Sequence, residues 1–308
     1  MKDKDEIKQI IEKVLSQHAE FASEDEAFAF VGQYVNQRNA QADPALGGLS
    51  PNQVDPLVNL PWDYPEHPMQ LNEGLSLSVL NAVPFLINAR RFLSDLMQET
   101  LPNVTATGNL NRRFVGQMLA RLDLEPGLAD QIQKVCKVIN EPDVFPLHVL
   151  RLVCDVAGLI RVRSKGYRVV KKHQSLLQET CAGQLYARLF KAYFTQFNLG
   201  FCDSFPDCPA VQTCIPFTLV QLARRAARWQ DLTAISHDLL LPMAREEMQQ
   251  SHRSIYDDDL LFIELRVLTH LEIFGLIECE RAEKEEYVTR VSRVRKTQLF
   301  DQFISFGW

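Results

Sequence analysis

The sequence predicts a mainly helical protein with two units in which a helix is followed by a β-hairpin. Apolar residues recur at helical spacing along most of the 308 residues. One phrase occurs twice without gaps: Leu150, Asp155, Val156, Gly158, Leu159 and Ile160, then Val267, Glu272, Ile273, Gly275, Leu276 and Ile277. Each copy precedes alternating residues that turn back, which indicates a hairpin. This order is typical of the last helix and wing of a winged helix, so we expect two winged-helix-like units.

Residues 1–100 are expected to form an N-terminal helical region. Two helices are predicted within 6–38, and a capping box at Ser23 opens the second. The density of prolines between 44 and 72 argues against regular helix or strand there. Helices resume at 77–100.

The first winged-helix-like domain is assigned to residues 101–175. A short strand is expected at 104–107, and helices are expected at 111–122 and 128–138. The helix of the repeat follows, and its hairpin extends to Lys171.

The middle region, residues 176–255, is predicted to be helical. Its clearest stretch, 182–198, places aromatic and aliphatic side chains on one face, which we expect to face the core. The second winged-helix-like domain is assigned to residues 256–308. Its helix begins near Asp257–Asp259, whose carboxylates favour a helix N-terminus.

Composition indicates a globular protein of the cytoplasm. Hydrophobic residues make up 46% and charged residues 23% of the chain. The polar first residues exclude a secretory leader, and no apolar run is long enough to span a membrane. The seven cysteines suggest reduced thiols rather than a disulfide framework.

Basic residues concentrate in the first unit, although the whole chain has a net charge of −6. Within 151–173 the only acid is Asp155. The bases are Arg151, Arg161, Arg163, Lys165, Arg168, Lys171 and Lys172. We expect Arg151 to face outward from the helix. In the hairpin, Arg161 and Arg163 should project outward while Ile160 and Val162 pack inward.

These seven side chains predict a nucleic-acid-binding or regulatory protein that contacts the phosphate backbone through a basic wing. The alternative is a non-enzymatic interaction scaffold in which both units dock other chains. DNA, a protein partner or a second copy of the chain are the expected partners. The second unit mixes bases with glutamates, which favours a packing or dimer contact over phosphate binding.

No catalytic residues, metal site or cofactor are predicted, because no P-loop, nucleophile elbow or zinc-protease motif is present. Cys202, Cys208 and Cys214 are too widely spaced for a zinc knuckle. His148 and His270 have no obvious carboxylate partner in the sequence, so we expect structural or surface roles for both.

Four phrases resemble a family of uncharacterised bacterial proteins of comparable length. They are Gly48-Leu49-Ser50-Pro51-Asn52-Gln53, Thr105-Ala106-Thr107-Gly108-Asn109-Leu110, Phe197-Asn198-Leu199-Gly200 and Arg295-Lys296-Thr297-Gln298-Leu299-Phe300. No activity is assigned to that family, so the resemblance implies no site. The stretch from Ala157 to Arg161 is also similar to winged-helix regulators. Those regulators often continue with a Thr-x-x-Gly turn, where this chain has Lys171-Lys172-His173-Gln174.

Overall fold

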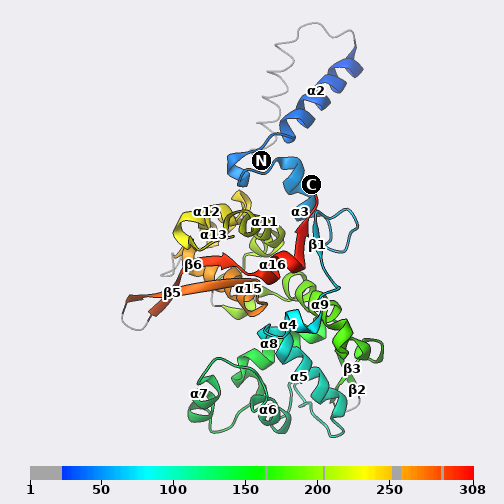
Figure 1. Cartoon of the computed structure of the whole chain (residues 1–308), viewed down its shortest axis with the longest axis vertical. Coiled ribbons are helices and arrows are strands. Elements are labelled where there is room, and N and C mark those ends of the chain that lie inside the picture. Colours follow the sequence, from blue (N-terminus) through cyan, green and yellow to red (C-terminus); the bar gives the residue numbers. More distant parts are fainter. Residues whose placement is uncertain (1–22, 164–165, 204, 252–257, 286–287) are drawn as a thin grey trace. The chain divides into compact units, whose positions relative to one another are not determined.

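The computed structural model describes residues 23–163, 166–203, 205–251, 258–285 and 288–308 (Figure 1). It divides into two compact units, Met1–Leu60 and Pro61–Trp308. The described part is mainly helical, so the predicted fold class is confirmed.

The described part of Met1–Leu60 contains α2 (Glu24–Asn39), the 3-10 turn η1 (Pro44–Leu46) and α3 (Pro51–Asn59). Ser23 caps α2 by accepting a hydrogen bond from a backbone N–H, as predicted. Helix α3 shows that the prediction of irregular structure between 44 and 72 is wrong. Pro51 occupies the first helical position, where no N–H bond is required, and Ser50 forms a capping box with Gln53.

The first helix-plus-hairpin unit combines α5 (Pro84–Gln98), α6 (Arg112–Leu119) and α8 (Phe145–Val156) with the hairpin of β2 (Ile160–Arg163) and β3 (Gly166–Val169). Between α6 and α8 lie α7 (Leu128–Val135) and η2 (Glu141–Asp143). The strand predicted at 104–107 is instead a turn, closed by a bridge between Val104 and Leu110.

The second helix-plus-hairpin unit also ends in a helix and a hairpin, and it has a short strand where the first has an isolated bridge. It contains α11 (Ile215–Arg225), β4 (Gln230–Asp231), α12 (Leu232–Leu239) and α13 (Pro242–Ser251). A last helix follows in three parts, α14 (Asp259–Ile263), the π-helical η6 (Glu264–Leu268) and α15 (Thr269–Ile273). The hairpin is β5 (Ile277–Glu285) and β6 (Val288–Lys296), and β4 adds to β6 in the order β4-β6-β5.

The repeated phrase has the same geometry in both units. Gly158 and Gly275 adopt φ values of 67° and 70° and end their helices. Each glycine N–H donates to the carbonyl three residues earlier at 2.8 Å. The leucine that follows each glycine is buried. Glycine is required here because this backbone region is strained for other residues.

Helix α9 (Ala182–Thr195) lies between the two helix-plus-hairpin units (Figure 1). Its aromatic face is buried, as predicted. Phe190 contacts Phe274, at the end of the last helix of the second helix-plus-hairpin unit, and Phe303, close to the C-terminus. A Cβ on Gly183 would lie 2.4 Å from the carbonyl oxygen of Glu73, so this close approach requires glycine.

The remaining elements complete the surroundings of this core. They are β1 (Met69–Leu71), α4 (Leu77–Leu80), η3 (Lys171–Leu177), η4 (Glu179–Cys181), η5 (Leu199–Cys202), α10 (Pro209–Thr213), α16 (Gln298–Phe303) and β7 (Ile304–Phe306). Strand β7 pairs with β1 in an antiparallel register. Asp258 caps α14, in agreement with the prediction that an acidic residue starts this helix, while Asp257 lies outside the described residues.

Candidate nucleic-acid interface

The first hairpin presents arginines to solvent. Arg161 and Arg163 on β2 are both exposed. Ile160 is buried, as predicted, but Val162 is 52% exposed, so the expectation that Val162 packs inward is wrong. Val162 lies near the end of the strand, where the core no longer covers it.

Two of the predicted site residues follow the hairpin instead of belonging to it. Strand β3 ends at Val169, and Lys171 begins the 3-10 helix η3. The predicted strand is therefore too long. Lys171 and Lys172 are nevertheless exposed, and Lys165 lies outside the described residues.

Four of these bases form no ion pair within the part of the chain that the structure describes. We call Arg161, Arg163, Lys171 and Lys172 the wing cations. Because no acidic partner lies beside them among the described residues, these side chains are available to an external anion.

Arg168, on β3, is more enclosed than the wing cations. Its guanidinium donates to the Tyr167 carbonyl at 2.8 Å. Burial acts to raise the pKa of Glu99, but hydrogen bonds and charge from Arg113, with further charge from Arg168, lower it below its usual value. The charge of Arg168 is thus partly balanced inside the fold.

Arg151 does not face outward, and that prediction is wrong. Its side chain is buried, and Nε donates to Glu141 Oε1 at 2.6 Å. Nη1 lies 3.2 Å from the hydroxyl of Tyr167, which itself donates to the Gly108 carbonyl at 2.8 Å. Arg151 therefore joins α8 to the hairpin and has no surface left for a phosphate.

The same buried carboxylate corrects a second expectation. His148 Nδ1 lies 2.6 Å from Glu141, so this histidine does have a carboxylate partner. Glu141 also accepts a hydrogen bond from the backbone N–H of Leu110. Sequence reasoning missed Glu141; the Asn-Glu-Pro-Asp phrase around it, in which Asn140 and Asp143 form a capping box, was the available signal.

The body of α8 offers few groups that could read bases. Only Phe145, Asp155 and Val156 are exposed along this helix. None of them is a side chain that pairs with a purine edge, as arginine, lysine, asparagine and glutamine do. The last helix of the second unit is likewise mostly buried between Phe262 and Leu271.

Three arginines of the second hairpin are matched by acids. Arg281 pairs with Glu272, Arg293 with Glu280 and Arg295 with Glu278, at 2.5, 2.9 and 2.6 Å. Arg295 also lies over the ring of Trp229, 4.7 Å from its centre. These guanidinium groups are therefore neutralised locally, in contrast to the wing cations.

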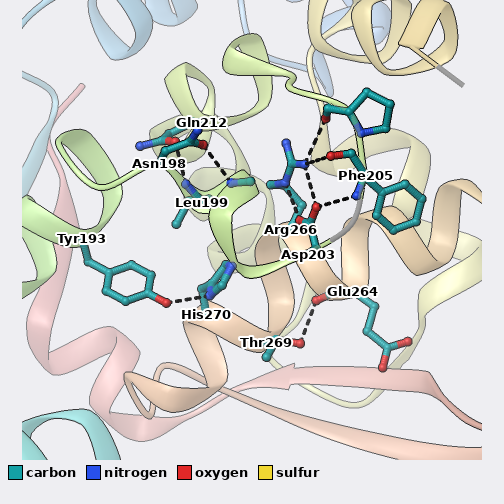
Figure 2. A network of polar contacts seen from close by, with 12 residues as sticks. Tyr193, Asn198, Leu199, Asp203, Phe205, Gln212, Glu264, Arg266, Thr269 and His270 are labelled. Carbon is teal, nitrogen blue, oxygen red and sulfur yellow. Dashed lines mark hydrogen bonds and ion pairs between the residues drawn. The ribbon is translucent and has the colours of Figure 1, made fainter. Parts of the chain in front are cut away.

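Figure 2 shows a buried polar network where the last helix of the second unit meets the loop that precedes α10. Arg266 donates to both carboxylate oxygens of Asp203, at 2.6 and 2.8 Å. One turn later, His270 Nδ1 lies 2.8 Å from the Tyr193 hydroxyl. Burial lowers the pKa of His270 to about 4, so its ring is neutral near pH 7. His270 lies in the core, as predicted, and this network fastens a loop to a helix.

The cysteines are free thiols, and several are buried. Burial raises the pKa of Cys202, Cys208 and Cys214 to about 12, so they remain protonated at neutral pH. Within the described ranges, no three histidine, cysteine or acidic side chains gather as a metal site would require. No helix there is both long and apolar enough to cross a bilayer.

Comparison with known families adds one finding. Residues 81–182 match the model of the Y4jL N-terminal domain. The match begins just before α5 and ends at the first residue of α9, so the Y4jL N-terminal domain model covers the first helix-plus-hairpin unit. This family is uncharacterised, as is the family that the sequence phrases resemble. Searches of curated proteins and of solved structures gave no match.

Proposed function

We propose that this protein binds nucleic acid through its phosphate backbone, with the wing cations as contacts and without reading base sequence. The observation that carries the proposal is the contrast between the two hairpins. The first hairpin and the start of η3 leave four cations without an acidic partner among the described residues, whereas Arg281, Arg293 and Arg295 of the second hairpin are paired. An unpaired basic patch on an acidic protein concentrates polyanions locally.

Backbone binding of this kind has a defined salt dependence. Each phosphate contact releases condensed counterions. A plot of the logarithm of the binding constant against the logarithm of salt concentration therefore has a slope of about −0.9 for each contact with duplex DNA. We propose no recognition of base sequence because the buried side chains of α8 cannot contact bases. We also propose that the protein acts in the cytoplasm.

The test is a salt titration followed by fluorescence anisotropy, with labelled duplex and single strands of unrelated sequence. Wild type should bind all of them with similar affinity. Arg161→Gln with Arg163→Gln should weaken every complex and reduce the salt slope by about 2.

Two variants serve as controls, each of which removes one positive charge. Arg295→Gln removes a hairpin arginine that is already paired. Lys134→Gln removes an exposed lysine on α7, which lies on the other side of the first helix-plus-hairpin unit from β2 and β3 (Figure 1). Both should keep the wild-type slope. A slope that falls equally in all three variants would count against a specific role for the wing.

The scaffold remains the second candidate, and one observation favours it. The last helices of both units are enclosed by their own fold, so the surfaces that winged helices usually offer to DNA are occupied. Absence of binding to duplex and single strands at low salt would reject the nucleic-acid proposal and favour docking of protein chains.

A further inference from the structure

A group of cationic side chains that shares Lys172 with the wing cations lies directly after the first hairpin. Helix η3 packs against α9, which brings Lys172 and His173 close to Arg188. Lys172 is exposed. Arg188 is half-buried, and its Nε donates to the Ala157 carbonyl at the end of α8 at 2.8 Å. This contact holds the guanidinium beside the start of the wing.

His173 sits among these cations with an unsatisfied ring nitrogen. Its Nε2 is enclosed and has no hydrogen-bond partner in the described structure. Burial lowers the pKa of His173 below its ordinary value, and the charges of Arg188 and Lys172 lower it further. Both charges that act on the ring are positive, so the site favours an anion.

The other charged groups on the elements around η3 do not compensate this charge. Lys191 of α9 is paired with Glu73, and Asp95 of α5 is paired with Arg121. Glu179 of η4 is exposed and does not contribute to the pKa of His173. Arg90 and Arg91 of α5 likewise do not contribute to the pKa of His173.

We propose that a phosphate group of nucleic acid binds beside Lys172 and Arg188, and that its binding is coupled to uptake of a proton from solvent by His173. This inference rests on the proposed function and adds a second phosphate position to it. The bound phosphodiester monoanion would offset the repulsion between the three neighbouring cations, and the imidazolium form of His173 would become favourable. Affinity for nucleic acid should therefore rise as pH falls.

The first test measures affinity for a labelled single strand at several pH values between about 5.5 and 8, the range over which histidine titrates. Affinity of the wild type should rise by about tenfold for each unit by which phosphate raises the His173 pKa. His173→Gln should match the wild type at high pH and lose the increase at low pH. Lys172→Gln should weaken binding at every pH.

The matched control is His237→Gln, since His237 is an exposed histidine on α12, outside the first unit. It should retain the wild-type pH dependence. A pH dependence that is identical in wild type and His173→Gln would overturn the inference while leaving the wing proposal intact.

A second test does not depend on nucleic acid. The imidazole signal of His173, assigned by its absence in His173→Gln, is followed by NMR during pH titration with and without tripolyphosphate. Tripolyphosphate should raise the titration midpoint of His173 and leave that of His237 unchanged. An unchanged His173 midpoint would overturn the site even if the protein binds DNA through the wing. A raised midpoint without DNA binding would support the site and reject the proposed function.

Discussion

The Arg151 guanidinium lies 2.6 Å from the Glu141 carboxylate, and both side chains are buried. The arginine that the sequence places on a recognition surface is thus an internal link between α8 and the hairpin. This pairing leaves phosphate contact to cations on and after the wing, and it makes the first unit dependent on one buried charge pair.

Arg151→Ala should lower the free energy of unfolding by about 3–5 kcal/mol, because Glu141 would remain buried without its cation. Urea denaturation measures this loss. Arg161→Ala, at an exposed site in the same unit, should change stability by no more than about 0.5 kcal/mol. Equal effects of the two substitutions would show that the buried pair has no special importance.

Gly183→Ala should destabilise the protein by about 1–3 kcal/mol, because the added methyl would meet backbone atoms of residues 73–75. Gly116→Ala in α6 is the matched comparison, since nothing lies within 4 Å of its added Cβ. That variant should be neutral or more stable by up to about 1 kcal/mol. Thermal unfolding distinguishes the two, and a stable Gly183→Ala protein would contradict the close approach.

Gly158→Ala and Gly275→Ala should each cost about 1–2 kcal/mol, because both residues adopt positive φ. The two costs should be similar, since the glycines end equivalent helices. Replacement by asparagine, which tolerates this conformation better, should restore part of the stability. If only one of the two alanine variants lost stability, the two glycines would not be energetically equivalent.

The free energy of unfolding should decrease in acid because His270 becomes protonated more readily in the unfolded chain than in the folded protein. Its pKa in the folded protein is about 4, below the ordinary 6.5, so the unfolded chain takes up the proton first. The contribution of its neutral ring is complete above pH 6.5 and is lost as pH falls toward 4, with a total of about 3 kcal/mol. Urea denaturation across this range should show a smaller pH dependence for His270→Gln, whereas His237→Gln should behave like wild type.

The sequence is a good guide to the elements that repeat a period or a phrase. The aromatic face of α9 and both glycine-terminated helices follow from helical spacing and from the aligned phrase. The candidate site is predicted less well, since Arg151 is helical and basic but its orientation depends on Glu141, ten positions earlier. A long-range contact of this kind leaves no periodic signal. Helix α3 was missed because proline density hides a capping box that begins at Ser50.

Two of the four phrases noted in the sequence have structural explanations. Asn198 caps η5, and Gly200 leaves room for the Arg266 guanidinium 3.3 Å from its would-be Cβ. Thr297 caps α16 and also donates to the carbonyl of Gly275 at 2.7 Å. Such residues determine where elements start and stop, so their presence reveals the fold without revealing a ligand.

The ring contacts of Phe190 have a consequence for biosynthesis. The helix that carries this residue needs Phe274 and Phe303 as neighbours, and both are translated about a hundred residues later. While the ribosome is still making that stretch, the nascent chain holds an aromatic surface that only earlier residues, such as Trp62 and Phe85, can cover. Chaperones that bind aromatic segments would have their best opportunity in this interval.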